Sequence, residues 1–137
     1  MFVDAGVMVA ILTEEPDGAD LATQLAVAGR KITNTLAVFE TAAAIFRIKR
    51  TTIERAGTQV LAFVETAAIE VLKISQEDAS LALQAYGLYG RHRYLDDRRK
   101  RSLNLADCCH YASAKACRQP ILTKDIGFAE TEIPVCP

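Results

Sequence analysis

Short apolar segments alternate with longer helical ones along the chain, and this alternation limits the possible fold more than any other feature. Strands are expected at residues 2–3, 31–33, 69–72, 121–123 and 133–135. Helices are expected over residues 6–12, 17–28, about 35–50, about 52–66, 76–88 and about 104–118. Parallel strands need long connections, which are usually helices. We therefore predict an α/β domain built around a mainly parallel sheet of four to five strands.

The composition suits one globular domain. The chain has 137 residues, half of them hydrophobic, so we expect residues 1–137 to form a single domain with a sizeable core. Its 16 Lys and Arg residues against 17 Asp and Glu residues give a net charge of -1. That balance excludes a general attraction to nucleic acid, so such a partner would need a local basic patch. No apolar run approaches the roughly 20 residues that span a membrane.

The four cysteines do not form a recognisable site. Cys108 and Cys109 are adjacent and cannot easily pair with each other, and neither Cys117 nor Cys136 completes a CxxC motif. The N-terminus carries Asp4 and lacks a basic leader, so no signal peptide is expected. We therefore predict reduced thiols in a cytoplasmic protein.

Three acidic residues stand alone in apolar surroundings. Asp4 is the only charge in residues 1–13, Glu40 the only one between Lys31 and Arg47, and Asp107 the only one between Arg101 and Lys115. A charge in an apolar element is costly to bury unless something pairs with it. We therefore expect the three carboxylates to share one acidic pocket.

A structural interpretation is available for most of the acids. Asp4, Asp107 and Asp125 lie at or near predicted helix starts, where aspartate commonly caps the helix or interacts with its dipole. Glu40 lies inside its predicted helix, so capping does not explain it. Asp4 and Asp125 also follow predicted strands, and ligands of parallel sheets bind at the carboxyl ends of strands.

Carboxylates that are close together repel one another unless a cation is present. Mg²⁺ and Mn²⁺ prefer carboxylate and water oxygens, and such an ion can activate water and bind a phosphodiester. No His or Cys cluster suits a softer metal, because His92 and His110 are far apart and Cys108 lacks partners at zinc spacing. We interpret His110 as a helix-surface or core residue.

Four segments carry a more specific pattern. They are residues 1–4 (Met-Phe-Val-Asp), the helical Glu40, residues 103–112 (Leu-Asn-Leu-Ala-Asp-Cys-Cys-His-Tyr-Ala) and residues 121–128 (Ile-Leu-Thr-Lys-Asp-Ile-Gly-Phe). Together they resemble the PIN-domain ribonucleases, in particular the VapC-type toxins of bacterial toxin–antitoxin pairs. The resemblance covers the whole chain, and residues 103–112 are its most specific part.

The resemblance implies a three-layer α/β/α fold and hydrolysis of RNA phosphodiester bonds that depends on Mg²⁺ or Mn²⁺. In the family's pattern Asp4, Glu40 and Asp107 are metal ligands or water activators, and Asp125 is a fourth, more peripheral acid. The resemblance also implies a homodimer and a cognate antitoxin whose tail occupies the acidic groove.

The chain departs from the family's pattern in two places. Ala5 and Gly6 stand where the family usually has a Ser or Thr and another small polar residue, so hydroxyl support for the site is missing. Aligning Phe128 with a common Gly-Asn-Asp-Phe-like ending puts Gly127 at the acid, whereas the spacing of Asp125 fits the broader PIN pattern. An alternative hypothesis is therefore a catalytically weakened PIN-like module that binds RNA or an antitoxin without turnover.

The predicted loop over residues 91–101 is the best candidate for contacting the RNA backbone. Its basic residues are opposed only by Asp96 and Asp97, and clustered cations can neutralise phosphates. They are Arg91, Arg93, Arg98, Arg99, Lys100 and Arg101. Tyr94 is placed to stack on an unpaired base. The alternative is a solvated loop with no ligand.

A third hypothesis is a phosphoacceptor receiver domain, which also combines carboxylates with a lysine near a late strand. That function needs its acids at strand ends, and the helical Glu40 argues against it.

Overall fold

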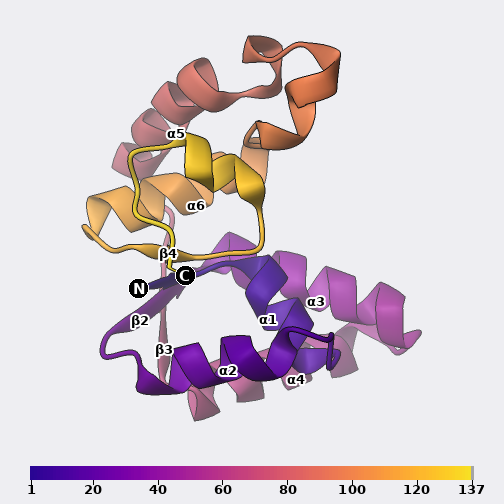
Figure 1. The fold of residues 1–137 in the computed structure, drawn as a ribbon. Coiled ribbons are helices and arrows are strands. Elements are labelled where there is room, and N and C mark those ends of the chain that lie inside the picture. The colour runs from indigo at the N-terminus through magenta and orange to yellow at the C-terminus, as the bar shows by residue number, and fades with distance from the viewer. Residues whose placement is uncertain (137) are drawn as a thin grey trace.

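Four short parallel strands form the centre of the molecule (Figure 1). The computed structural model describes residues 1–136. The strands are β1 (Phe2–Val3), β2 (Lys31–Asn34), β3 (Ile69–Leu72) and β4 (Ile121–Leu122). They lie in the order β3-β2-β1-β4, and every neighbouring pair is parallel. The predicted α/β class and parallel sheet are confirmed.

Helices cover both faces of this sheet, as the predicted three-layer α/β/α fold requires (Figure 1). One layer holds α1 (Ala5–Leu12), α2 (Gly18–Val27), α3 (Thr35–Lys49) and α4 (Ile53–Thr66). The other holds α5 (Gln76–Tyr89) and α6 (Leu105–Ala116). None of the helices described over residues 1–136 is both long and apolar enough to cross a bilayer.

The strands bury side chains on both faces, which explains why they are apolar without interruption. Successive side chains of a strand point to opposite faces. Phe2 and Ile121 therefore pack in the core shared with α5 and α6, whereas Val3 and Leu122 pack in the core shared with α1 to α4.

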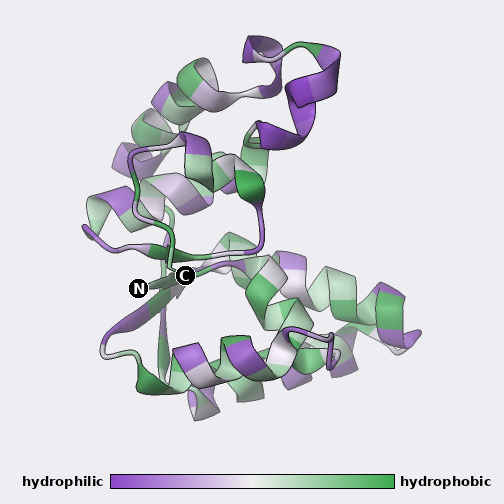
Figure 2. Ribbon diagram, in the orientation of Figure 1, coloured by the Kyte–Doolittle hydropathy of each residue, from purple (hydrophilic) through white to green (hydrophobic). Residues whose placement is uncertain are grey.

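The structure corrects two expectations in the C-terminal half. Instead of the strand expected at residues 133–135, the structure has a single bridge between Ile121 and Val135. Pro134 has no N–H to donate, so the pairing does not extend into a strand. The loop expected at residues 91–101 forms two short 3₁₀ helices, η1 (Arg91–Arg93) and η2 (Asp96–Arg101). The latter is strongly hydrophilic (Figure 2).

The strand order creates a switch point beside β1. From β1 the chain moves to β2 on one side, and after β3 it crosses to β4 on the other side. The carboxyl ends of β1 and β4 thus lie side by side, at the point where the strand order changes direction. Such a point is where open parallel sheets bind ligands.

Candidate active site

The structure brings the four predicted acids to this point of the sheet. Asp4 directly follows β1, Glu40 lies in α3, Asp107 lies in the first turn of α6, and Asp125 precedes the short 3₁₀ helix η3 (Ile126–Glu130). All four line one hollow of about 330 Å³. Ala5, Gly6 and Lys124 complete its lining. The expected shared acidic pocket is therefore present.

Asp4 is held by a hydroxyl that the sequence analysis did not identify. Its residue occupies the N-cap position of α1, but its side chain makes no capping hydrogen bond. Instead the Thr123 hydroxyl, just beyond β4, donates to Oδ2 of Asp4 at 2.6 Å. Asp4 is therefore the N-cap residue by position, as expected, but without a side-chain capping bond. The hydroxyl support that Ala5 and Gly6 cannot give comes from Thr123, next to the neighbouring strand β4.

Asp107 serves the helix and the pocket at once. Oδ2 of Asp107 accepts the backbone N–H of Asn104 at 2.7 Å, while the Asn104 side chain accepts the N–H groups of Ala106 and Asp107. This reciprocal capping box fixes the start of α6. Asp125 has a similar local bond, since its Oδ1 accepts the N–H of Gly127 at 2.7 Å. Both carboxylates therefore enter the pocket on backbone-fixed turns.

The helix that carries Glu40 is fixed by the buried Asn34 at the end of β2. The side-chain oxygen of Asn34 accepts the N–H of Ala37 at 2.9 Å, which caps α3. Its amide nitrogen donates to the Ser113 hydroxyl of α6 at 3.0 Å. One side chain thus sets the relative positions of the helices that carry Glu40 and Asp107.

His110 is a site residue whose role the sequence analysis missed. It is only 1% exposed, and its Nε2 lies 2.8 Å from Oε2 of Glu40 and 3.9 Å from Oδ1 of Asp4. Because an ionised carboxylate can only accept, the imidazole N–H donates to Glu40. Nδ1 is buried with no hydrogen-bond partner among the described residues. His110 follows Asp107 by about one helical turn, so the two residues share a face of α6. Its hydrogen-bond partner Glu40, however, is 70 residues away in the sequence.

The electrostatics of the pocket disfavour ionised carboxylates. Burial raises the pKa of the Asp4 carboxyl, against the opposing effects of His110 and the Thr123 hydrogen bond. Burial also raises the pKa of Asp107 to about 7, and the charges of Asp125 and Asp4 raise it further against the hydrogen bond from Asn104. A nearby cation would relieve this cost.

The donor chemistry fits a hard divalent cation. Mg²⁺ usually binds through one or two carboxylates and keeps several water ligands. Among residues 1–136, no three His, Cys, Asp or Glu side chains are close enough to form a ready-made metal cage. The two buried carboxylates with raised pKa values, Asp4 and Asp107, are the best placed to hold such an ion.

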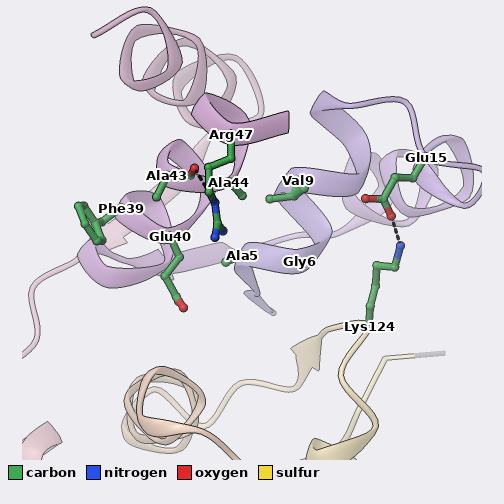
Figure 3. Close-up of a pocket in the computed structure, with 10 residues that line it drawn as sticks. All are labelled: Ala5, Gly6, Val9, Glu15, Phe39, Glu40, Ala43, Ala44, Arg47 and Lys124. Atoms are coloured by element: carbon green, nitrogen blue, oxygen red, sulfur yellow. Dashed lines mark hydrogen bonds and ion pairs between the residues drawn. The ribbon is translucent and has the colours of Figure 1, made fainter. Parts of the chain in front are cut away.

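Lys124 does not behave as the receiver-domain hypothesis requires. Although Lys124 lines the hollow, its ammonium group pairs with Glu15 (Figure 3) and with Asp17, the latter at 2.8 Å. Among the described residues it forms no ion pair with the four acids of the hollow. This engagement of Lys124 argues against the receiver-domain alternative.

The predicted basic residues are all exposed on η1 and η2. Two of them form surface ion pairs, Arg99 with Asp96 at 2.6 Å and Arg101 with Glu130 at 2.7 Å. Arg101 lines a hollow that also contains Thr123 and Asp125. The basic segment therefore ends beside the acidic pocket, at Arg101.

A family profile described as PIN domain matches residues 1–134. The chain belongs to the PIN-domain family. Curated PIN-domain relatives agree with the VapC-type resemblance. A protein named Ribonuclease VapC from Mycolicibacterium smegmatis is 31% identical over 97% of both chains. Ribonuclease VapC30 from Mycobacterium tuberculosis is 29% identical over 97% of this chain and 95% of its own length.

Solved structures confirm the PIN fold. The crystal structure of Mycobacterium tuberculosis VapC20, a sarcin-ricin loop cleaving toxin, matches with a TM-score of 0.70 at 16% identity. It covers 96% of this chain and 95% of its own. A toxin–antitoxin complex from Klebsiella pneumoniae matches with the same score at 14% identity, over 99% and 95% of the two chains. At these identities the matches concern the fold.

Proposed function

We propose that this chain is a divalent-metal-dependent endoribonuclease, the toxin of a type II toxin–antitoxin pair. The observation that carries the proposal is the convergence of Asp4, Glu40, Asp107 and Asp125 on one hollow. Each comes from a different element of a PIN fold, and curated relatives across nearly the whole chain are named ribonucleases. Phosphodiester hydrolysis is the reaction for which such an acid set is suited.

The four acids have different parts in this proposal. Asp4, Asp107 and Glu40 would hold Mg²⁺ or Mn²⁺, which, when bound, offsets the gathered negative charge and polarises a water and the phosphodiester. Thr123 fixes the Asp4 carboxylate, and His110 fixes that of Glu40. Asp125 also lines the hollow, where it would orient the water or accept its proton.

The hydroxyl from Thr123 favours an active enzyme over the catalytically weakened module. The main reason for that alternative is the pair Ala5-Gly6, which offers no hydroxyl to Asp4. The structure gives Asp4 a 2.6 Å hydrogen bond from Thr123 instead. At Gly6 an added Cβ would lie in ordinary van der Waals contact with Oδ2 of Asp4, at 3.5 Å.

The RNA strand would approach over η1 and η2. Arg91, Arg93, Arg98 and Lys100 form no ion pair with the described residues, so their charges are available to phosphates. Arg99 and Arg101 would exchange their exposed pairs for phosphate contacts. Since η2 leads into the helix of Asp107, phosphates held there are directed to the acids.

Two protein partners belong to the proposal. The first is a cognate antitoxin, which is supported by the similarity of this fold to a toxin–antitoxin complex from Klebsiella pneumoniae. Its tail would occupy the acidic groove. The second is another copy of this chain, in a homodimer. Co-purification of an antitoxin and the molecular mass in solution test these two points separately.

The first prediction concerns the reaction itself. We expect the protein to cleave an RNA pool when Mn²⁺ or Mg²⁺ is present and to stop when EDTA is added. Asp4→Asn should lower the rate about 100-fold or more while the circular dichroism spectrum is unchanged. RNA binding without turnover at every metal concentration would support the weakened module. Wild-type rates for both Asp4→Asn and Glu40→Gln would exclude the proposed site.

The second prediction concerns His110. His110→Leu keeps the buried volume but removes the hydrogen bond to Glu40, so we expect a rate loss of roughly 10-fold. The half-exposed Glu40 can regain water, so the free energy of unfolding should change by only about 1 kcal/mol. His110→Gln retains an N–H donor and should recover part of the rate. Equal rates for His110→Leu and the wild type would show that Glu40 needs no positioning.

A further inference from the structure

A second hollow adjoins the acidic pocket on the side of α3 (Figure 3). It has a volume of about 430 Å³, within the range of small-ligand sites. Four residues line both hollows, so the two are continuous: Ala5, Gly6, Glu40 and Lys124. On its other side the acidic pocket shares Asp125 and Lys124 with the hollow that contains Arg101. The acids therefore lie midway along a continuous depression.

Phe39 gives this side hollow an unusual wall. Its ring is 66% exposed although Phe39 directly precedes Glu40 in α3. Small side chains, including Ala43, Ala44 and Ala5, also line the hollow. An exposed aromatic ring beside small apolar side chains offers a stacking surface to an unpaired base, and such stacking tolerates any base.

Arg47 gives the same hollow a free positive charge. Figure 3 shows its guanidinium pointing toward Ala5 and Glu40 rather than away from the protein. It donates to the backbone oxygen of Ala43 at 3.3 Å and forms no ion pair with any described residue. Arg47 follows Glu40 by seven positions in the sequence, which places its backbone about 10 Å further along the helix. Lys124, in contrast, is already neutralised by Glu15 and Asp17.

We propose that this side hollow is a nucleotide subsite, in which the RNA strand next to the cleaved bond stacks a base on Phe39 and places a phosphate on Arg47. The proposal rests on the ribonuclease function proposed above. A strand bound at the acids must continue in both directions. Arg101 lies at one end of the depression and Arg47 at the other, so each outgoing segment meets a cation.

Binding measurements on the cleavage-deficient Asp4→Asn protein test the subsite without turnover. In that background we expect Phe39→Ala and Arg47→Gln each to weaken binding of a short single-stranded RNA about 10-fold. Arg47→Gln should also lower the slope of log affinity against log salt by about 0.7, whereas Phe39→Ala should not. Phe39→Tyr and Arg47→Lys should retain most of the affinity.

Matched controls come from the same surface. Phe46→Ala removes another exposed phenylalanine of α3, and Arg55→Gln removes an exposed arginine of α4. Neither residue lines the depression.

Kinetic measurements use proteins that retain Asp4. In these proteins Phe39→Ala should raise KM about 10-fold and leave kcat within about 2-fold. An abasic site next to the cleaved bond should weaken wild-type binding but leave the Phe39→Ala protein unaffected.

The possible outcomes separate the two proposals. If the wild type cleaves RNA and both variants match their controls, the subsite is wrong and the ribonuclease function stands. If the variants keep RNA affinity but escape inhibition by a protein partner, the hollow is a protein-docking groove and the subsite is again overturned. If the wild type neither binds nor cleaves RNA, the proposed function fails and the subsite falls with it.

Discussion

Replacing Asp107 by Asn is expected to abolish RNA cleavage and, at the same time, to make the metal-free protein more stable. Burial raises the pKa of Asp107 to about 7 from an ordinary value of 3.8. The folded state therefore binds more protons than the unfolded state between these pH values, and stability falls as the pH rises from about 4 to about 7. Above pH 7 the whole cost is present.

The variant removes that cost. A pKa rise from 3.8 to about 7 corresponds to roughly 4 kcal/mol. Because Asn is a weaker partner than Asp for the backbone N–H of Asn104, we expect a net gain of roughly 1 to 3 kcal/mol at pH 8 and little gain near pH 4. Urea unfolding in EDTA over this pH range measures the difference.

The other capping box supplies a matched control. Asp78 occupies the same third position in α5, accepts the N–H of Ser75 at 2.8 Å, and is also buried. It does not line the acidic pocket. Asp78→Asn should therefore weaken a helix start without relieving any repulsion in the pocket, and stability should fall by about 1 kcal/mol. A parallel loss in Asp107→Asn at pH 8 would contradict the proposed crowding of charge.

Asn34→Ala is expected to have the largest effect on folding. Asn34 is fully buried, caps α3 and bonds to Ser113 in α6. The substitution removes the cap and leaves a cavity in a polar site, so we expect a loss of about 3 kcal/mol and a fall in Tm of roughly 10 °C. Thermal unfolding followed by circular dichroism measures both.

An exposed cap distinguishes this effect from ordinary capping. Thr52 begins α4, and its side chain accepts the N–H of Arg55 at 3.3 Å on the surface. Thr52→Ala should cost only about 1 kcal/mol. If Asn34→Ala costs no more than Thr52→Ala, the link between α3 and α6 contributes nothing. We also expect Asn34→Ala to lower the cleavage rate below the melting range, because Glu40 and Asp107 lie on the two linked helices.

Structural features that depend on residues close together in the sequence could be predicted from the sequence alone. The alternation of apolar and helical segments located four strands and most helix starts, including those of α3, α5 and α6. Isolated acids in apolar elements, together with the family pattern, indicated that the four carboxylates meet. A single carboxylate buried without a partner would cost too much free energy. Isolated acids in apolar segments therefore indicated that these carboxylates are buried together.

Contacts between distant segments could not be predicted in this way. The bond from His110 to Glu40 depends on how α6 packs against α3, and neither residue's neighbours in sequence indicate it. Thr123 replaces a hydroxyl expected after Asp4, because two parallel strands end side by side. Arg47 enters the side hollow from two helical turns beyond Glu40, so only the three-dimensional arrangement connects it with the acids.

The pairing of β1 with β4 has a consequence during protein synthesis. Asp4 is synthesised before its hydrogen-bond donor, because the hydroxyl that holds it belongs to Thr123, which is added 119 residues later. Asp125 follows later still. A growing chain therefore carries an unfinished acid set through most of its translation. The acid set is therefore completed only when β4 joins β1 and the central sheet closes.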